Sequence, residues 1–221
     1  MRNGLTELVF ILDRSGSMSG LEADTIGGYN ALMEKQKKEE GEVLVSTVLF
    51  DDKIEVIHDR VALDRVPAMT EKEYYVRGCT ALLDALGGAI HHIGNVHKYA
   101  RDEDRPEKTL FIITTDGQEN SSHSYTYEKV KKMVERQKEK YGWEFLFLGA
   151  NIDAIAEAGR FRIAPERAVR YQCDEEGTAV NFRALGKAVS RVRKCSGAQM
   201  SAALAEDWKE EIEADYRKRG K

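Results

Sequence analysis

The stretch "FILDRSGSM", from Phe10 to Met18, decides the fold of this chain. It continues the unbroken apolar run "LVFIL", which is typical of a strand that is covered on both faces of a sheet. The run ends at Asp13, and Ser15 and Ser17 follow at alternate positions, with Gly16 between them to allow a sharp turn. A buried strand therefore delivers one carboxylate and two hydroxyls to a single point.

Strand-like apolar runs alternate with helical segments along most of the chain. The strand runs are 8–12, 43–50, 109–115, 143–150 and, more weakly, 168–173. The helical segments are 20–40, 80–96, 127–141, 153–158 and the one that carries Phe182, Leu185, Val189 and Val192 on one face. This alternation predicts an α/β fold, with a Rossmann-like, doubly wound and mostly parallel sheet that has helices on both faces. A tight turn at Asp51-Asp52 leads into "KIEVIHD", which predicts one antiparallel edge strand.

Two further loops carry oxygen ligands of the same kind as the first. Thr80 opens a helix in "GCTALLDAL", and Asp116 ends a strand in "ITTDGQ", where Gly117 lets the loop turn away. Ligands in such sheets bind beyond the carboxyl ends of the strands, so we expect these side chains to meet Asp13, Ser15 and Ser17 there. Carboxylates and hydroxyls without sulfur or imidazole suit Mg²⁺, Mn²⁺ or Ca²⁺ better than zinc.

These segments resemble a known site. "DRSGSM", "GCTALLDAL" and "ITTDGQ" are similar to the three parts of the metal-ion-dependent adhesion site (MIDAS) of von Willebrand factor A (VWA) domains, and the resemblance covers roughly residues 5–194. It implies that a metal ion, Mg²⁺ first of all, is held by Asp13, Ser15, Ser17, Thr80 and Asp116, with the serines binding directly and the aspartates largely through water. It also places the chain with the intracellular bacterial members of the family, several of which act with AAA+ ATPases.

The resemblance implies a binding module and not an enzyme. A Mg²⁺ ion that keeps a water ligand can exchange it for a Glu or Asp carboxylate of a partner protein. We expect Arg14 and Arg77 to flank that carboxylate. The alternative is a metal-dependent hydrolase such as a phosphatase, for which Glu119 is the candidate base. A third possibility is a metal site that only holds the loops together.

Composition limits the partners and the cellular compartment that we expect for the protein. The net charge of −4, with acidic and basic residues interspersed, argues against nucleic acid as a partner. No apolar run has the length of a membrane span, and no secretory signal is seen at the start of the sequence. Cys79, Cys173 and Cys195 are odd in number and scattered, which is typical of reduced thiols in a cytoplasmic protein.

The last part of the chain departs from the alternation. "CSGAQ", which starts at Cys195, interrupts the pattern, so we predict a VWA domain over residues 1–195 and an amphipathic helical tail over 196–221. In the tail, apolar residues recur every fourth position and predict a single helix, which we expect to fold back on the domain, with a partner-binding helix as the alternative: Met200, Leu204, Trp208, Ile212 and Tyr216.

Two sets of polar side chains are expected to face solvent. One is the group of histidines at positions 91, 92, 97 and 123, which show no metal-ligand spacing of the H-E-x-x-H type. The other is a basic stripe on the helix before the tail, made of Arg183, Lys187, Arg191 and Lys194.

Overall fold

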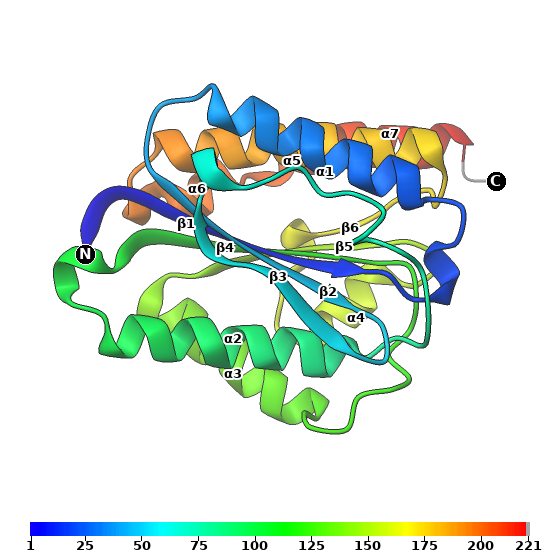
Figure 1. The fold of residues 1–221 in the computed structure, drawn as a ribbon, viewed down its shortest axis with the longest axis horizontal. Coiled ribbons are helices and arrows are strands. Elements are labelled where there is room, and N and C mark those ends of the chain that lie inside the picture. Colours follow the sequence, from blue (N-terminus) through cyan, green and yellow to red (C-terminus); the bar gives the residue numbers. More distant parts are fainter. Residues whose placement is uncertain (220–221) are drawn as a thin grey trace.

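The computed structural model describes residues 1–219 of the chain, except for the side chain of Glu206; positions 220 and 221 of the expected tail helix lie outside this range. One six-stranded sheet runs through the molecule (Figure 1). Its strands are β1 (Arg2–Asp13), β2 (Val43–Phe50), β3 (Ile54–Ala62), β4 (Pro106–Thr115), β5 (Glu144–Gly149) and β6 (Ala168–Arg170).

The order of the strands across the sheet is β3-β2-β1-β4-β5-β6. All neighbouring pairs are parallel except β2 and β3, which form the expected antiparallel hairpin at one edge. The predicted α/β class, the mostly parallel sheet and the antiparallel edge strand are therefore confirmed. The central strand β1 contains the apolar run of residues 8–12 and ends at Asp13.

Helices cover both faces of the sheet (Figure 1). The helices of one face are α1 (Glu22–Lys37), α5 (Glu175–Lys194), α6 (Met200–Ala203) and α7 (Glu210–Arg219), and those of the other are α2 (Leu82–Tyr99), α3 (Tyr127–Tyr141) and α4 (Ala154–Arg160). Side chains alternate along β1, so that Leu8 and Phe10 pack in the first core while Val9 and Ile11 pack in the second. Within residues 1–219, no helix has the length and apolar character needed to span a membrane.

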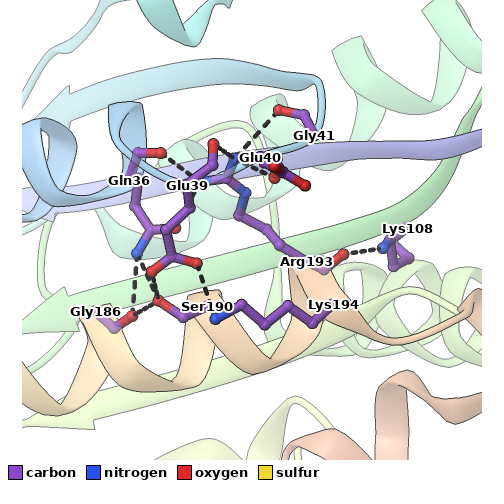
Figure 2. A network of polar contacts seen from close by, with 9 residues as sticks. All are labelled: Gln36, Glu39, Glu40, Gly41, Lys108, Gly186, Ser190, Arg193 and Lys194. Carbon is purple, nitrogen blue, oxygen red and sulfur yellow. Dashed lines mark hydrogen bonds and ion pairs between the residues drawn. The ribbon is translucent and has the colours of Figure 1, made fainter.

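A buried arginine joins two helices on the first face. Arg193 of α5 donates hydrogen bonds to the carbonyl oxygens of Glu39, Glu40 and Gly41, which follow the end of α1 (Figure 2). Gln36 of α1 in turn donates from Nε2 to the Gly186 carbonyl oxygen at 3.0 Å. A cation at the carbonyl end of a helix is favourable, because those groups have no partner within the helix.

The expected single tail helix is wrong, although its apolar pattern is confirmed. The tail consists of two short α-helices, α6 and α7, each preceded by a short 3₁₀ helix, and the chain breaks between them near Leu204 and Ala205. Met200, Leu204, Trp208 and Ile212 are nevertheless at most 4% exposed and pack in the same core as α1 and α5. The indole N–H of Trp208 donates to the Glu166 carbonyl oxygen at 2.9 Å, which adds a polar anchor to this packing.

The basic stripe of α5 is exposed, as expected, and it also forms ion pairs at the surface. Arg183 and Lys187 both pair with Glu211 of α7, and Arg191 pairs with Asp207 at 2.8 Å. The stripe thus faces acidic residues of the tail, which the spacing of the basic residues within one helix cannot reveal.

One of the histidines expected at the surface is buried. His97, in the last turn of α2, contacts the buried carboxylate of Glu7 through Nε2. Glu7 lies on the central strand β1 and needs partners there, because a buried carboxylate without them is costly. The sequence of α2 alone does not show that its last turn lies over this residue.

Candidate metal centre

Three loops meet at the carboxyl edge of the sheet. Asp13 is the last residue of β1, Thr80 comes just before α2, and Asp116 directly follows β4, which is the neighbour of β1. The side chains of all three are buried, as is that of Ser15, whereas Ser17 is exposed. The parallel order of β1 and β4 places their final residues side by side.

Hydrogen bonds connect the first loop to the third. The backbone N–H of Ser15 donates to Asp13 Oδ1 at 2.7 Å, which holds the turn against the end of β1. The Oγ atoms of Ser15 and Ser17 are 3.1 Å apart. Ser17 Oγ donates to Asp116 Oδ1 at 2.5 Å, so the two carboxylates are linked through the serine pair.

The second loop reaches the same place. A Cβ atom added at Gly117 would lie 2.8 Å from Thr80 Oγ1 and 3.3 Å from Ser17 Oγ, so only glycine leaves room for both hydroxyls. Thr80 is held by a pair of hydrogen bonds with Asn120, from Thr80 N to Oδ1 and from Asn120 N to the Thr80 carbonyl oxygen. The structure thus brings all five residues predicted from the sequence together.

The negative charge of this cluster has no cationic partner within residues 1–219. Burial raises the pKa of Asp13 to about 6, against hydrogen bonds from Thr115 and Ser15 that favour the ionised form. Burial also raises the pKa of Asp116, and its hydrogen bond from Ser17 opposes the shift. Two buried carboxylates side by side are unfavourable unless a positive charge joins them or a proton neutralises one.

The donor set fits a hard divalent cation. Within residues 1–219, no three His, Cys, Asp or Glu side chains gather in a way that could hold a metal ion, so this cluster offers two carboxylates and takes its remaining oxygens from hydroxyls. Mg²⁺, Mn²⁺ and Ca²⁺ accept such oxygen ligands, together with water. The space beside Gly117 that a Cβ would fill lies between two of the hydroxyls.

Two residues of the cluster were missed by sequence reasoning. Thr115 is buried and donates from Oγ1 to Asp13 Oδ2 at 2.6 Å. Cys173, which follows β6, lies with Sγ 3.6 Å from Asp116 Oδ2. Burial and the nearby Asp116 carboxylate raise the pKa of the Cys173 thiol to about 12, so it remains a protonated donor at neutral pH. Thr115 directly precedes the predicted ligand Asp116 in the sequence, so its position could have suggested a role. Cys173 is far from every predicted ligand in the sequence, and no local pattern indicates its place in the cluster.

The expected position of Arg14 at the rim is wrong. Its side chain is fully buried and pairs with Asp51 at 2.9 Å and with Glu55 at 2.8 Å. Arg77 also pairs with Asp51 but is partly exposed, and both guanidinium groups lie 5.1 Å from the centre of the Tyr75 ring. A buried guanidinium must be paired on several sides, and that requirement turns Arg14 away from the candidate metal centre.

Glu119 holds backbone N–H groups in place and does not face the candidate metal centre with a free carboxylate. Its carboxylate accepts hydrogen bonds from the backbone N–H groups of Leu83, Ser121 and Ser122. It therefore fastens the third loop to the first turn of α2. A carboxylate that is held by several backbone donors is poorly suited to act as a general base.

No protein-family model matches this sequence. No curated protein matches it either. Solved structures do match in three dimensions. Proximal thread matrix protein 1 from the mussel byssus aligns with a TM-score of 0.56 at 15% identity, over 85% of this chain and 46% of its own. A von Willebrand factor type A protein from Catenulispora acidiphila aligns with a TM-score of 0.52 at 14% identity, over 82% of this chain and 41% of its own.

The fold of this chain is therefore the α/β fold of VWA domains. The chain spans less than half the length of the solved chains it matches. The mussel protein has also been solved with a zinc-occupied MIDAS motif, and that structure aligns with a TM-score of 0.56 at 16% identity, over 85% of this chain and 46% of its own. At these identities the likeness concerns the fold, and the ion is a property of the mussel protein.

The raised pKa of Asp13 predicts a pH-dependent stability of the metal-free protein. Asp13 binds a proton more tightly in the folded chain, with a pKa of about 6, than in the unfolded chain, where it is 3.8. Its contribution to stability is thus present below about pH 4 and is lost as the pH rises through 6, by roughly 3 kcal/mol. Urea unfolding in EDTA between pH 4.5 and 7.5 measures this loss. Asp13→Asn should remove that part of the pH dependence, and an Asn variant with the same pH profile would contradict the assignment.

Proposed function

We propose that this protein is a metal-dependent protein-binding module. Asp13, Ser15, Ser17, Thr80 and Asp116 hold a divalent cation, Mg²⁺ first and Mn²⁺ or Ca²⁺ as alternatives, in the manner of a MIDAS. The domain that does so covers residues 1–195, with residues 196–221 as an appended tail. The observation that carries the proposal is the pair of buried carboxylates that are connected through Ser15 and Ser17 and have no cationic partner within the described residues.

The partner completes the coordination of the metal. The three hydroxyls of Ser15, Ser17 and Thr80 are neutral ligands and the two aspartates bind largely through water, so a divalent ion keeps affinity for one more anionic oxygen. Ser17 is exposed, which leaves one side of the cluster open to a partner protein. A Glu or Asp carboxylate of that partner replaces a water on the ion. Arg77 is partly exposed near the same edge and can add a charge-assisted hydrogen bond.

The proposed role is binding without catalysis. The hydrolase alternative needs a base beside the metal, and its candidate, Glu119, is held by backbone donors of the third loop. We place the protein in the cytoplasm of a bacterium, with an AAA+ ATPase as a candidate partner and with neither nucleic acid nor membrane among its ligands. These assignments follow the family resemblance and the charge balance of the sequence.

Metal binding should stabilise the fold. An ion that binds only the folded chain adds about 2.7 kcal/mol at a hundredfold excess over Kd. For a domain of this size each kcal/mol raises the melting temperature by roughly 2–4 °C, so millimolar Mg²⁺ or Mn²⁺ should raise it by several degrees at pH 7.5. Thermal unfolding with increasing metal measures the effect. Ser17→Ala should weaken the response, and Ser19→Ala, at an exposed serine with the same spacing along the chain, should leave it unchanged. A melting temperature that does not change with the metal concentration would rule out the metal centre.

Thr115 should act as a positioning residue for Asp13. Thr115→Val removes the hydroxyl that donates to Asp13 Oδ2 while it keeps the shape of the side chain. Loss of such a supporting hydrogen bond typically lowers metal affinity by about 10–100-fold. Isothermal titration with Mn²⁺ measures the change. Thr114→Val is the matched control, because Thr114 lies on the same strand but points to the other face of the sheet. Equal affinities for the two variants would remove Thr115 from the site.

Partner binding should require both the metal and the open side of the site. Capture of partners from a lysate should fail in EDTA and return with Mg²⁺. Thr80→Ala should weaken the capture, and so should a substitution of one acidic residue on the partner. A partner that is retained in EDTA and by Thr80→Ala must bind another surface. Hydrolysis of p-nitrophenyl phosphate that Asp13→Ala abolishes would favour the phosphatase alternative.

A further inference from the structure

A groove runs between α2 and α3, which lie side by side on the second face of the sheet (Figure 1). It consists of two adjoining parts, with volumes of about 250 and 150 Å³, that share Gly94, Lys98, Gln137 and Tyr141. Lys98 is in the last turn of α2, and Tyr141 is the last residue of α3. The groove therefore lies toward the amino edge of the sheet, away from the three loops. Its size suits a small ligand.

The charged side chains that line the groove are cationic. They are Lys98, Arg105 and Arg136, and no Asp or Glu of residues 1–219 lines either part. Arg105 pairs with Asp102 at 3.0 Å, whereas Lys98 and Arg136 form no ion pair within the described part of the chain. The excess of positive charge in the groove is thus not neutralised by the protein itself.

The acidic side chains beside the groove already have partners. Glu7, which contacts His97 of the groove wall, is buried and also pairs with Arg60. Glu135 of α3 pairs with Arg162 at 2.9 Å. A larger hollow of about 680 Å³ adjoins the groove, and its lining includes acidic as well as basic residues. The uniformly positive lining therefore belongs to the groove and not to that hollow.

The Tyr141 hydroxyl lies in this positive field. Hydrogen bonding from Arg136, with a further contribution from Lys140, holds the pKa of the hydroxyl below its ordinary value. Arg136 is therefore directed toward Tyr141, which lines both parts of the groove. Cations in the last turn of a helix are favourable in any case. Arg136 lies before the last turn of α3, so that general preference does not account for it.

A nearly buried amide in the groove has no partner. Gln137 lies on the buried face of α3 with Val130 and Val134 and is 9% exposed. Its side-chain amide makes no hydrogen bond within residues 1–219, yet it is not sealed from water. Its Nε2 atom lies beside Gly94, where an added Cβ would be 3.2 Å away. Since an unpaired buried amide is costly, a ligand that accepts its N–H groups would be favourable there.

We propose that this groove binds the phosphate group of a small monoester. A phosphate dianion carries several acceptor oxygens, and Arg136, Lys98 and the N–H groups of Gln137 are donors. The planar fork of a guanidinium matches two phosphate oxygens, and the flexible stem of an exposed lysine can follow the ligand. Ile90 and Met133 line the outer part and offer an apolar surface to the organic group of the monoester.

Calorimetric titration of the full-length protein with glycerol 3-phosphate tests the proposal. EDTA and low salt are used, because EDTA prevents phosphate from binding through a metal ion at the other edge and low salt limits screening. Saturable binding at millimolar concentration is expected. Glycerol, which is neutral, should not bind, and acetate and inorganic phosphate should bind more weakly. No saturable binding, or acetate as tight as glycerol 3-phosphate, would overturn the proposal. Equal affinity for inorganic phosphate would refute the role of the organic group.

Two variants of α3 separate a specific contact from net charge. Arg136→Gln should weaken the binding of glycerol 3-phosphate roughly tenfold or more, the effect of one lost charge-assisted hydrogen bond. Lys132→Gln removes the same charge from an exposed residue one turn earlier, which pairs with Glu128 and does not line the groove, and should leave the affinity nearly unchanged. Equal losses in the two variants would show that only net charge acts and would refute the site.

Gln137→Met tests the buried amide. Methionine keeps the length of the side chain and removes both N–H groups, so glycerol 3-phosphate should bind roughly tenfold more weakly. The melting temperature should stay the same or rise, because an unpaired amide is removed from the buried face of α3. A merely structural role of Gln137 would show the opposite result, with a lower melting temperature and full affinity for the phosphate.

Discussion

Two buried carboxylates, Asp13 and Asp116, stand side by side at the carboxyl edge of the sheet, and the surrounding loops are arranged around their charge. Burying an ionised carboxylate is costly unless donors or cations surround it. Here a backbone N–H and three side-chain hydroxyls or thiols supply hydrogen bonds, while no cation of residues 1–219 pairs with either group. Such an arrangement is most favourable when an external cation joins it, and the proposed function rests on that physical point.

The same requirement for partners explains how the helices are tied to the sheet. Arg193 donates to the carbonyl groups that follow α1, and Lys108 donates to the carbonyl oxygen of Arg193 (Figure 2). Lys108 also donates to the carbonyl oxygen of Cys195. Lys209 of the tail donates to the Pro165 and Ala168 carbonyl oxygens beside β6. Each buried cation satisfies backbone acceptors at the end of an element. The tail is therefore joined to the sheet by polar contacts as well as by Trp208 and its apolar neighbours.

The two edges of the sheet have different chemistry. The carboxyl edge gathers oxygens with negative charge and little positive charge, which suits a hard metal ion. The amino edge has a hollow lined by Trp143, His97 and Thr109 together with charged residues of both signs. One strand reaches both ends: β1 carries Glu7, which orients His97, and ends at Asp13. A change in the position of β1 would therefore alter the residues at both edges.

The sequence by itself determined the α/β class and the antiparallel edge strand, and it pointed to the five residues that the structure brings together at the candidate metal centre. It did so because apolar runs, turn residues and hydroxyls at fixed spacing are local signals, and because parallel strands bring their carboxyl ends to one edge. Only the tertiary structure decided where the charged side chains point. Arg14 turns inward because Asp51 and Glu55 lie beside it, and His97 is buried because Glu7 needs a partner. Thr115 and Cys173 support the aspartates, and the tail breaks into short helices over the core. These outcomes depend on pairing between residues far apart in the chain, and no local pattern encodes the partner of a buried charge.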